Sequence, residues 1–404
     1  MKIIPDDFIR KAGEIHGEKG LAWIDQLPAI VANCEQRWGL RFAPPVTYQS
    51  NAYHYIAPAI RSDGTVVVVK IHAPTNEFTQ EAEALRLFDG HGMVRLLDYN
   101  ISDKAMLLER LEPGTPLSEV EDDEEAVLSR RPDIVLLSTK SFLPQVADQL
   151  RACARHGANV VTIAEECLYP FSSSPALAAE IDALAKHYGV TITGSGHQDI
   201  FWVNMVTLLL GASHRISSIS GKASWNADDY GADIIKSKHV GETLEEFHTS
   251  IERSDRAPTY GRNVLGAIAR NAGFTPKGWT SEVQPVVAAA DLASKSLGAT
   301  LRKGVVVGYS DVDHLQTFEG PLLSFEMAGH IYAPGQVDLN EWHITGEPEL
   351  FLSNGKVPTQ MTTCTQFVNR IPDVINAAPG FITVDALPQA RFRSLPLHAY
   401  VGWA

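Results

Sequence analysis

The 404-residue sequence contains four cysteines, and no two of them form a CxxC pair. Cysteines scattered in this way do not match the spacing of a zinc site or a disulfide framework, so we expect small buried thiols and no bound metal. No segment holds the roughly 20 apolar residues that a membrane span requires, and the opening MKIIPDDFIRK lacks the apolar run of a secretory signal. We therefore expect a cytoplasmic protein without a membrane partner.

Basic residues are also scarce relative to acidic ones: 34 Lys and Arg face 48 Asp and Glu, which gives a formal net charge of -14. Binding to nucleic acid requires clustered cations that neutralise phosphates, so the composition disfavours such a partner. The length and the 45% hydrophobic content predict two or three folded domains.

An acidic run, EVEDDEE at 119–125, separates two parts of the chain with different patterns. Like charges at this density repel one another, which favours a solvated linker or an exposed helix start. We place a domain boundary near Ala126.

Before this boundary, VVVVKI at 66–71 is a β-branched run that follows the turn signal SDG, and YQSNAYHYIAPAI at 48–60 fits the paired strand of a hairpin. EFTQEAEALRLF at 77–88 has helical spacing, and MVRLLDYNI and AMLLERL then return to strand patterns. This order, with the segment ERLEPGTPL, resembles the amino-terminal lobe of aminoglycoside phosphotransferases, in particular the streptomycin and hydroxyurea kinases.

The kinase resemblance implies a nucleotide site in residues 1–126. Lys70 would hold the nucleotide phosphates, Glu81 would pair with Lys70, and Ser50 and Asn51 would lie in the loop that covers the phosphates. The alternative for Lys70 is a solvated lysine at a strand edge. No HGDxxxxN-like run follows Ala126, so the catalytic lobe is absent and phosphoryl transfer is expected to be disabled.

After the boundary, strands and helices alternate regularly: strands at 133–138, 159–165 and 190–196, with helices around 142–155, 175–187 and 200–210. This alternation predicts parallel βαβ units, whose ligands lie beyond the carboxyl ends of the strands. The turns STKS, AEE and GSGHQD occupy these ends. They supply the predicted cofactor-binding residues Ser138, Thr139, Lys140, Ala164, Gly194 and Gly196.

The segments PDIVLLSTKSF, NVVTIAEECLYP and VNRIPD resemble 2,4-diaminopentanoate dehydrogenases and related native amine dehydrogenases, whose fold is similar to that of dihydrodipicolinate reductase. The resemblance covers residues 127–404. It implies reversible deamination of an amine to a ketone and ammonia, with NADP or NAD as cofactor. A glutamate of the AEE turn would face the amine, with Glu165 as first choice and Glu166 as second, while the other caps the following turn.

Further polar and aromatic residues follow the third strand. His197, Gln198 and Asp199 are predicted to contact substrate or nicotinamide. A structural histidine and a helix N-cap at Asp199 are the alternatives. Trp225, Asn226 and Tyr230 in WNADDY are predicted to line the substrate pocket, although an aromatic at this position is equally consistent with core packing.

Beyond residue 212, strands outnumber helices. We expect helices around TLEEFH and VQPVVAAADLASKSL, and strands at HRISSISGKAS, RKGVVVGYS, LLSFEMAGHIY, NEWHITG and ELFLSN. The predicted fold class is therefore α/β and α+β: a kinase-like lobe at 1–126, the second half of a Rossmann-like domain at 127–211, and an antiparallel substrate and dimerisation domain at 212–404 that forms a homodimer.

The first half of the dinucleotide-binding domain has no counterpart in the sequence. Residues 1–126 contain no strand followed by a Gly-rich phosphate turn, and GEIHGEKG at 13–20 follows no strand. Three interpretations remain: an amine dehydrogenase-like enzyme that holds its cofactor poorly, a nucleotide-binding remnant of a phosphotransferase, and a non-catalytic dimeric scaffold. The first accounts for most of the chain.

Overall fold

The computed structural model describes residues 4, 6–42, 54–75, 77–112, 114, 124–253 and 259–402. The chain separates into two compact units, Met1–Asp122 and Asp123–Ala404. The division falls close to the boundary expected near Ala126, while a further division at residue 211 stays a prediction. In the described part of the chain, no helix is both long and apolar enough to cross a membrane.

The first unit contains an antiparallel sheet flanked by two helices, α1 (Asp6–Trp38) and α2 (Phe78–Phe88). Its strand order in the described residues is β1-β2-β3-β5-β4. The strands are β1 (Leu40–Phe42), β2 (Tyr55–Arg61), β3 (Val66–Ile71), β4 (Leu96–Asn100) and β5 (Ala105–Glu109). The predicted hairpin and helix are confirmed, whereas the sequence patterns did not indicate α1, which consists of two helices joined across a kink at Gly17.

Strand β3 shows why both faces of this sheet are covered. Side chains alternate along a strand, so Val67 and Val69 point to one face, where they pack with Leu27 of α1. Val68 points to the other face and packs with Phe78 of α2. The continuous β-branched run therefore serves two separate cores.

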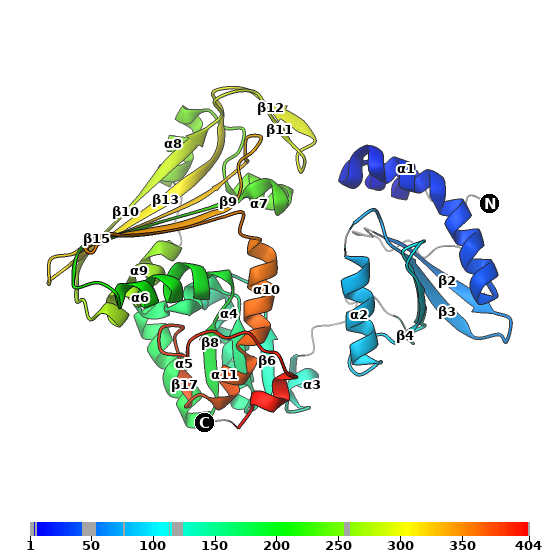
Figure 1. Cartoon of the computed structure of the whole chain (residues 1–404), viewed down its shortest axis with the longest axis horizontal. Helices are drawn as coiled ribbons and strands as arrows, with labels where there is room; N and C mark the ends of the chain where they lie inside the picture. Colours follow the sequence, from blue (N-terminus) through cyan, green and yellow to red (C-terminus); the bar gives the residue numbers. More distant parts are fainter. Residues whose placement is uncertain are drawn as a thin grey trace. The chain divides into compact units, whose positions relative to one another are not determined.

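The second unit begins with a parallel sheet of order β17-β8-β7-β6 within the described residues. Its strands are β6 (Ile134–Leu137), β7 (Asn159–Thr162), β8 (Thr191–Gly194) and β17 (Gly380–Phe381). Helices α4 (Leu143–Arg155) and α5 (Pro175–Tyr188) contribute to the core on one face, and α11 (Ile371–Asn376) contributes to the core on the other. Figure 1 shows these helices around the short strands.

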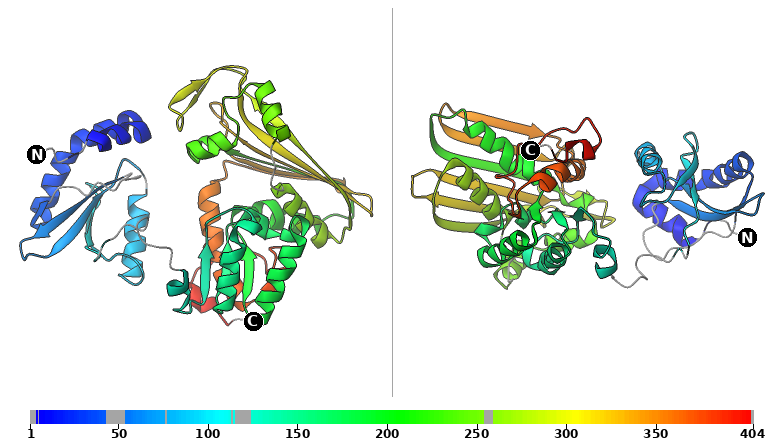
Figure 2. Two further views of the ribbon diagram at one scale, coloured as in Figure 1. Left: turned by 180° about the vertical axis from the view of Figure 1, so that it is seen from behind. Right: turned by 90° about the horizontal axis from the view of Figure 1, so that it is seen from below.

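A larger sheet follows, with strand order β10-β13-β14-β9-β15-β16 in the described residues. Its strands are β9 (Arg215–Asn226), β10 (Pro276–Val287), β13 (Val306–Thr317), β14 (Leu322–His330), β15 (Leu339–Glu347) and β16 (Leu350–Gly355). All neighbours are antiparallel except β9 and β14. Helices α6 (Met205–Leu210) and α9 (Tyr260–Ala272) pack against one face, and Figure 2 shows the sheet from two further sides.

The remaining elements of the second unit are short. They are α3 (Glu124–Leu128), α7 (Ala232–Ser237), α8 (Leu244–Arg253), α10 (Thr359–Asn369), the hairpin β11 (Leu292–Ser294) and β12 (Ala299–Leu301), the 3-10 turns η2 (Glu165–Leu168), η3 (Pro170–Ser172), η5 (Ala227–Asp229) and η6 (Leu397–Tyr400), and a π-helical turn η4 (Asp199–Asn204).

The predicted fold class, mixed α/β with a Rossmann-like sheet and an antiparallel domain, is confirmed. The helix predicted over VQPVVAAADLASKSL is wrong, because Val283 and Val286 lie in strand β10, paired along its length with β13. The run of alanines indicated a helix, but Pro285 is incompatible with a helix interior and the β-branched valines suit a strand. Pairing with β13 decides the outcome.

Candidate functional site

The carboxyl ends of β6, β7 and β8 lie at one edge of the parallel sheet, as the alternation predicted. The turn after β6 contains Ser138, Thr139 and Lys140, which are all exposed. The turn after β7 contains Ala164, which is fully buried, and then the two glutamates. These turns are the framework of the candidate site.

Glu166 is the structural member of the glutamate pair. It is 1% exposed, and one carboxylate oxygen accepts the backbone N–H of Leu143 at 2.6 Å. The other oxygen accepts the hydroxyls of Ser173 and Ser174, each at 2.6 Å. Since Leu143 is the first residue of α4, the carboxylate satisfies a free N–H at the positive end of that helix.

Glu165 lies next to it, only partly buried, at the start of η2. Burial raises the pKa of this carboxyl above its usual range, and a hydrogen bond with the Ser141 side chain opposes the shift. The negative charge of Glu165 in turn helps to raise the pKa of Tyr230 and Tyr260. Glu165 therefore lies close to two phenols, and its carboxyl holds a proton more tightly than an exposed glutamate does.

Each of the two phenols close to Glu165 contacts a second aromatic ring. The ring of Tyr260 stacks on Phe142 with centroids 5.2 Å apart, and Tyr230 meets Trp225 edge to face at 5.0 Å. Burial raises the pKa of Tyr230 to about 12, so its phenol is neutral and can donate a hydrogen bond at physiological pH. These four rings, Phe142, Trp225, Tyr230 and Tyr260, form an aromatic wall. Its ring faces are apolar, and hydrogen-bond donors lie at the ring edges.

The side chain of Lys238 places a cation against two aromatic rings. The ammonium of Lys238 is 4.0 Å from the ring centroid of Tyr309 and 5.5 Å from that of Trp225. These distances are within the range of a cation–π interaction. Lys238 therefore lies against the ring faces of Tyr309 and Trp225.

His197 and Gln198 belong to the packed interior. The His197 ring stacks on Phe201 at 4.4 Å, its Nδ1 lies 3.0 Å from the Thr362 hydroxyl, and burial lowers its pKa to about 4. Gln198 is 4% exposed and donates to the Ser195 carbonyl. The structural alternative for His197 accounts for these contacts, and its contact with substrate stays a prediction.

The predicted substrate contact of Asp199 is wrong. Asp199 is fully buried and forms a two-point ion pair with the equally buried Arg370, at 2.7 and 2.8 Å. Ser195, Asn204 and Gln366 donate to the same carboxylate. Both oxygens are therefore used inside the protein. The N-cap alternative is also wrong, because Asp199 is the first residue of η4 and its side chain is directed to these partners.

Asn226 also has a local role, whereas Trp225 remains part of the aromatic wall. The Asn226 side-chain oxygen accepts the backbone N–H groups of Asp228 and Tyr332 at 3.2 and 3.3 Å. Such bonds to nearby backbone are typical of an asparagine that caps a turn. Its predicted contact with substrate is not needed to explain its position.

The two glycines after β8 are required by packing. A side chain at Gly194 would come within 2.4 Å of the Cys167 backbone, and Gly196 has φ of +135° in a turn where a side chain would meet Gln198. These turns can flank a nicotinamide ring. No described turn supplies the backbone cradle for a pyrophosphate, and GxGxxG does not occur in the sequence. The residues present therefore fit only part of a dinucleotide.

In the first unit, the predicted pairing of Lys70 with Glu81 is present. The Lys70 ammonium lies 2.6 and 2.8 Å from the two oxygens of Glu81, and the buried His72 lies 3.1 Å from the same carboxylate. These contacts, the bond with His72 first, lower the pKa of Glu81 to about 2. Ser50 and Asn51 lie outside the described residues.

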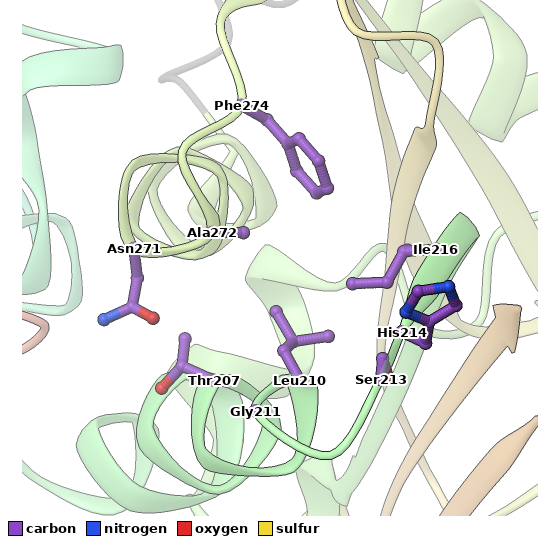
Figure 3. A pocket seen from close by; sticks show the side chains of 9 residues that line it. All are labelled: Thr207, Leu210, Gly211, Ser213, His214, Ile216, Asn271, Ala272 and Phe274. Atoms are coloured by element: carbon purple, nitrogen blue, oxygen red, sulfur yellow. The ribbon is translucent and has the colours of Figure 1, made fainter. Parts of the chain in front are cut away.

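A separate hollow of about 430 Å³ lies between α6, α9 and the start of β9 (Figure 3). Leu210, Ile216 and Phe274 line it together with His214 and Asn271. None of the residues predicted to bind substrate or cofactor lines this hollow, so it is distinct from the strand-end site.

Sequence patterns missed Tyr260 and Lys238 as members of the site. Tyr260 begins helix α9 and Lys238 follows α7, both more than 70 residues after Glu165. Neither belongs to a recognisable motif. Only the packing of the large sheet over the strand-end turns brings them to this place.

Comparison with known proteins finds amine-utilising dehydrogenases among the relatives of this chain. The solved structure of the amine dehydrogenase from Mycobacterium smegmatis is 52% identical, with a TM-score of 0.63, over 68% of this chain and 81% of that chain. The chain belongs to the amine dehydrogenase family. The family model of the 2,4-diaminopentanoate dehydrogenase C-terminal domain matches residues 201–394. The 2,4-diaminopentanoate dehydrogenase of Acetoanaerobium sticklandii is 28% identical over 284 residues, which are 66% of this chain and 77% of that protein.

The first unit has different relatives. The family model of aminoglycoside/hydroxyurea antibiotic resistance kinases matches residues 40–133. The streptomycin 6-kinase of Streptomyces griseus is 41% identical over 124 residues, 31% of this chain and 40% of the kinase. Both resemblances predicted from the sequence are confirmed. The amine dehydrogenase class of function and a nicotinamide dinucleotide as cofactor class are confirmed as well.

Proposed function

We propose that the second unit carries out reversible oxidative deamination of an alkylamine to a ketone and ammonia, with Glu165 acting on the amine nitrogen. The proposal depends most on one observation, the contrast between the two adjacent glutamates. Glu166 uses both oxygens to accept hydrogen bonds from structural donors, whereas Glu165 lies close to the phenols of Tyr230 and Tyr260.

The chemistry explains why a carboxylate belongs there. An alkylammonium ion has no free nitrogen lone pair, so it must lose a proton before its carbon can become a cationic iminium carbon. Glu165 would hold the ammonium by charge and accept that proton at a carboxylate oxygen, and once the proton has passed to solvent the carboxylate would stabilise the positive iminium. Attack of water on the iminium carbon would then release the ketone and ammonia. In the reverse direction, the protonated carboxyl would return the proton to the new amine. The raised pKa of Glu165 brings it closer to the working pH of a general base.

The bound nicotinamide would accept or supply the hydride of this reaction. Ser138, Thr139, Lys140, Ala164, Gly194 and Gly196 are proposed to lie beside it, because they occupy or flank the strand ends. The choice between NADP and NAD depends on a ribose-binding side chain in the half-domain that has no counterpart here.

The proposal is tested by reductive amination of short ketones with excess ammonia and either NADPH or NADH at high concentration. Concentrated cofactor compensates for weak binding of the phosphates, since each charge-assisted hydrogen bond is worth roughly 1.5–3 kcal/mol. We expect slow oxidation of NAD(P)H that requires both ketone and ammonia. Oxidation that proceeds equally without ammonia would contradict the proposal.

A second function is favoured by the pairing of Lys70 with Glu81, which leaves the first unit able to bind a nucleotide without turning it over. Titration with ATP should give saturable binding that Lys70→Met weakens. Lys70→Met should leave the binding of NADPH by the second unit unchanged. If wild type and Lys70→Met bind ATP equally, Lys70 has no nucleotide role.

We also infer a homodimer that acts in the cytoplasm. The large sheet carries one face without the helices α6 and α9, and exposed apolar residues such as Phe351 (63% exposed) lie at its end. Sedimentation equilibrium should give twice the mass of the chain, 44.1 kDa. A monomer would contradict this inference.

A further inference from the structure

Strand β6 is the outermost strand of the parallel sheet and pairs with β7 alone in the described part of the chain. The Asp133 carbonyl accepts the N–H of Asn159 at 3.2 Å, and the Leu137 carbonyl accepts the N–H of Ile163 at 3.1 Å. In a parallel ladder, alternate residues bond to the same neighbour. The backbone groups of Ile134 and Leu136 are therefore directed to the other side, the open edge.

The composition of β6 is that of an interior strand. Its sequence IVLL is wholly apolar, as in parallel strands that are covered on both faces. Yet Leu136 is 42% exposed, and Val127 in the preceding helix α3 is 63% exposed. An apolar edge with free donors and acceptors is a template for another strand, and this strand has no proline or charge to prevent pairing.

The same edge borders the incomplete cofactor site. Ser138 to Lys140 follow β6 directly and are exposed. In a doubly wound sheet, the dinucleotide lies in the crevice between two half-sheets, at the strand ends. A strand added beside β6 would bring its own carboxyl-end turn next to these residues. The chain also matches only 81% and 77% of the two amine-utilising relatives, which therefore contain segments with no counterpart in the matched region.

We propose that the β6 edge binds, in parallel register, a βαβαβ segment that carries a Gly-rich phosphate turn and is supplied by a separate polypeptide. The added segment would complete both the sheet and the dinucleotide site. A second copy of this chain is a weaker candidate, because two β6 strands related by a two-fold axis pair antiparallel and bring no phosphate turn. The identity of the bound cofactor rests on the proposed function, whereas the strand pairing does not.

The test is co-expression of the full chain with a tagged amino-terminal βαβαβ segment from an amine dehydrogenase, followed by affinity purification and mass measurement. Leu136→Pro removes the outward N–H and leaves the β7 ladder intact, because Val135 and Leu137 carry the bonds to β7. Leu136→Lys keeps the N–H but places a charge at the edge. Leu208→Lys, at a 66% exposed position on α6, is the matched control. Circular dichroism and thermal unfolding verify that each variant is folded.

We expect a one-to-one complex with wild type and with Leu208→Lys, and at least about tenfold weaker association with both Leu136 variants. NADPH fluorescence should show tighter binding in the complex than in the chain alone. Absence of a complex, equal association of Leu136→Lys and wild type, or a homodimer that both Leu136 variants disrupt would overturn the inference. A complex that forms through β6 without amine dehydrogenase activity would support the pairing and contradict the proposed function instead.

Discussion

The carboxylate of Glu166 accepts the first backbone N–H of helix α4, that of Leu143, at 2.6 Å. This bond fixes the turn after β7 against the helix that follows β6, two elements connected by a parallel crossover. It also explains the assignment of roles within the pair of glutamates. Because Glu166 holds the turn in place, Glu165 is positioned by the backbone and its side chain can serve the site.

Glu166→Gln should lower stability more than turnover. The amide keeps one oxygen for Leu143 but removes the charge that Ser173 and Ser174 also use. Hydrogen bonds to charged groups contribute about 1.5–3 kcal/mol, and we expect a loss of that order in the free energy of unfolding. Urea denaturation monitored by tryptophan fluorescence measures it. Unchanged stability would show that the three bonds carry no net free energy.

Arg370→Met should be strongly destabilising. Arg370 and Asp199 are both fully buried, so removing the guanidinium leaves a buried carboxylate without its counter-charge. Breaking such a pair costs about 3–5 kcal/mol. The double variant Asp199→Asn with Arg370→Met should recover part of this loss, because no isolated charge remains. A double variant as unstable as the sum of the two single variants would contradict the pairing.

His197 should make stability dependent on pH. Burial lowers its pKa from 6.5 to about 4, so between these values the unfolded chain binds a proton that the native state does not. The stabilisation is therefore complete above pH 6.5 and is lost as pH falls towards 4, by up to about 3 kcal/mol. His197→Phe keeps the stacking on Phe201 and cannot be protonated. Its stability should fall less steeply with acid; parallel curves would refute this assignment.

Glu165 should act in the opposite direction. Its pKa is raised above the ordinary value of 4.5, so the native state holds a proton longer than the unfolded chain does. Its contribution to stability is greatest below pH 4.5 and is lost as pH rises through the raised pKa. Glu165→Gln cannot ionise, and its stability relative to wild type should increase from acidic to neutral pH. A constant difference would contradict the raised pKa.

The strand and helix order of the second unit could be predicted because each element has a strong local pattern. IVLL, VVT and TIT are short runs of aliphatic and β-branched residues followed by turns, and Pro144 and Pro175 lie at early helical positions. The segment at 283–297 could not be predicted, since its alanines favour a helix. Residues 283–287 instead end strand β10, which pairs with β13, and residues 292–294 form β11, which pairs with β12. Local propensity is a weak guide where a long partner strand decides the conformation.

The candidate site was predictable to a similar extent. The two glutamates follow a strand end and could be named, but their roles depend on Leu143, Ser173 and Ser174, whose hydrogen bonds no spacing encodes. The predicted substrate contact of Asp199 is wrong because its hydrogen-bond partners also cannot be read from sequence spacing. Its true partner, Arg370, lies 171 residues away in the chain, so only the folded structure shows that the pair is structural.

The central claim is that Glu165 carries the amine chemistry and Glu166 does not. It is tested most directly by the rate of reductive amination of a short ketone for wild type, Glu165→Gln and Glu166→Gln, each measured at a temperature where all three are folded. We predict that Glu165→Gln lowers turnover about 10²–10⁴-fold, the usual loss for a general acid or base, while Glu166→Gln stays near wild type. Equal turnover in wild type and Glu165→Gln, or a larger loss in Glu166→Gln, would contradict the account.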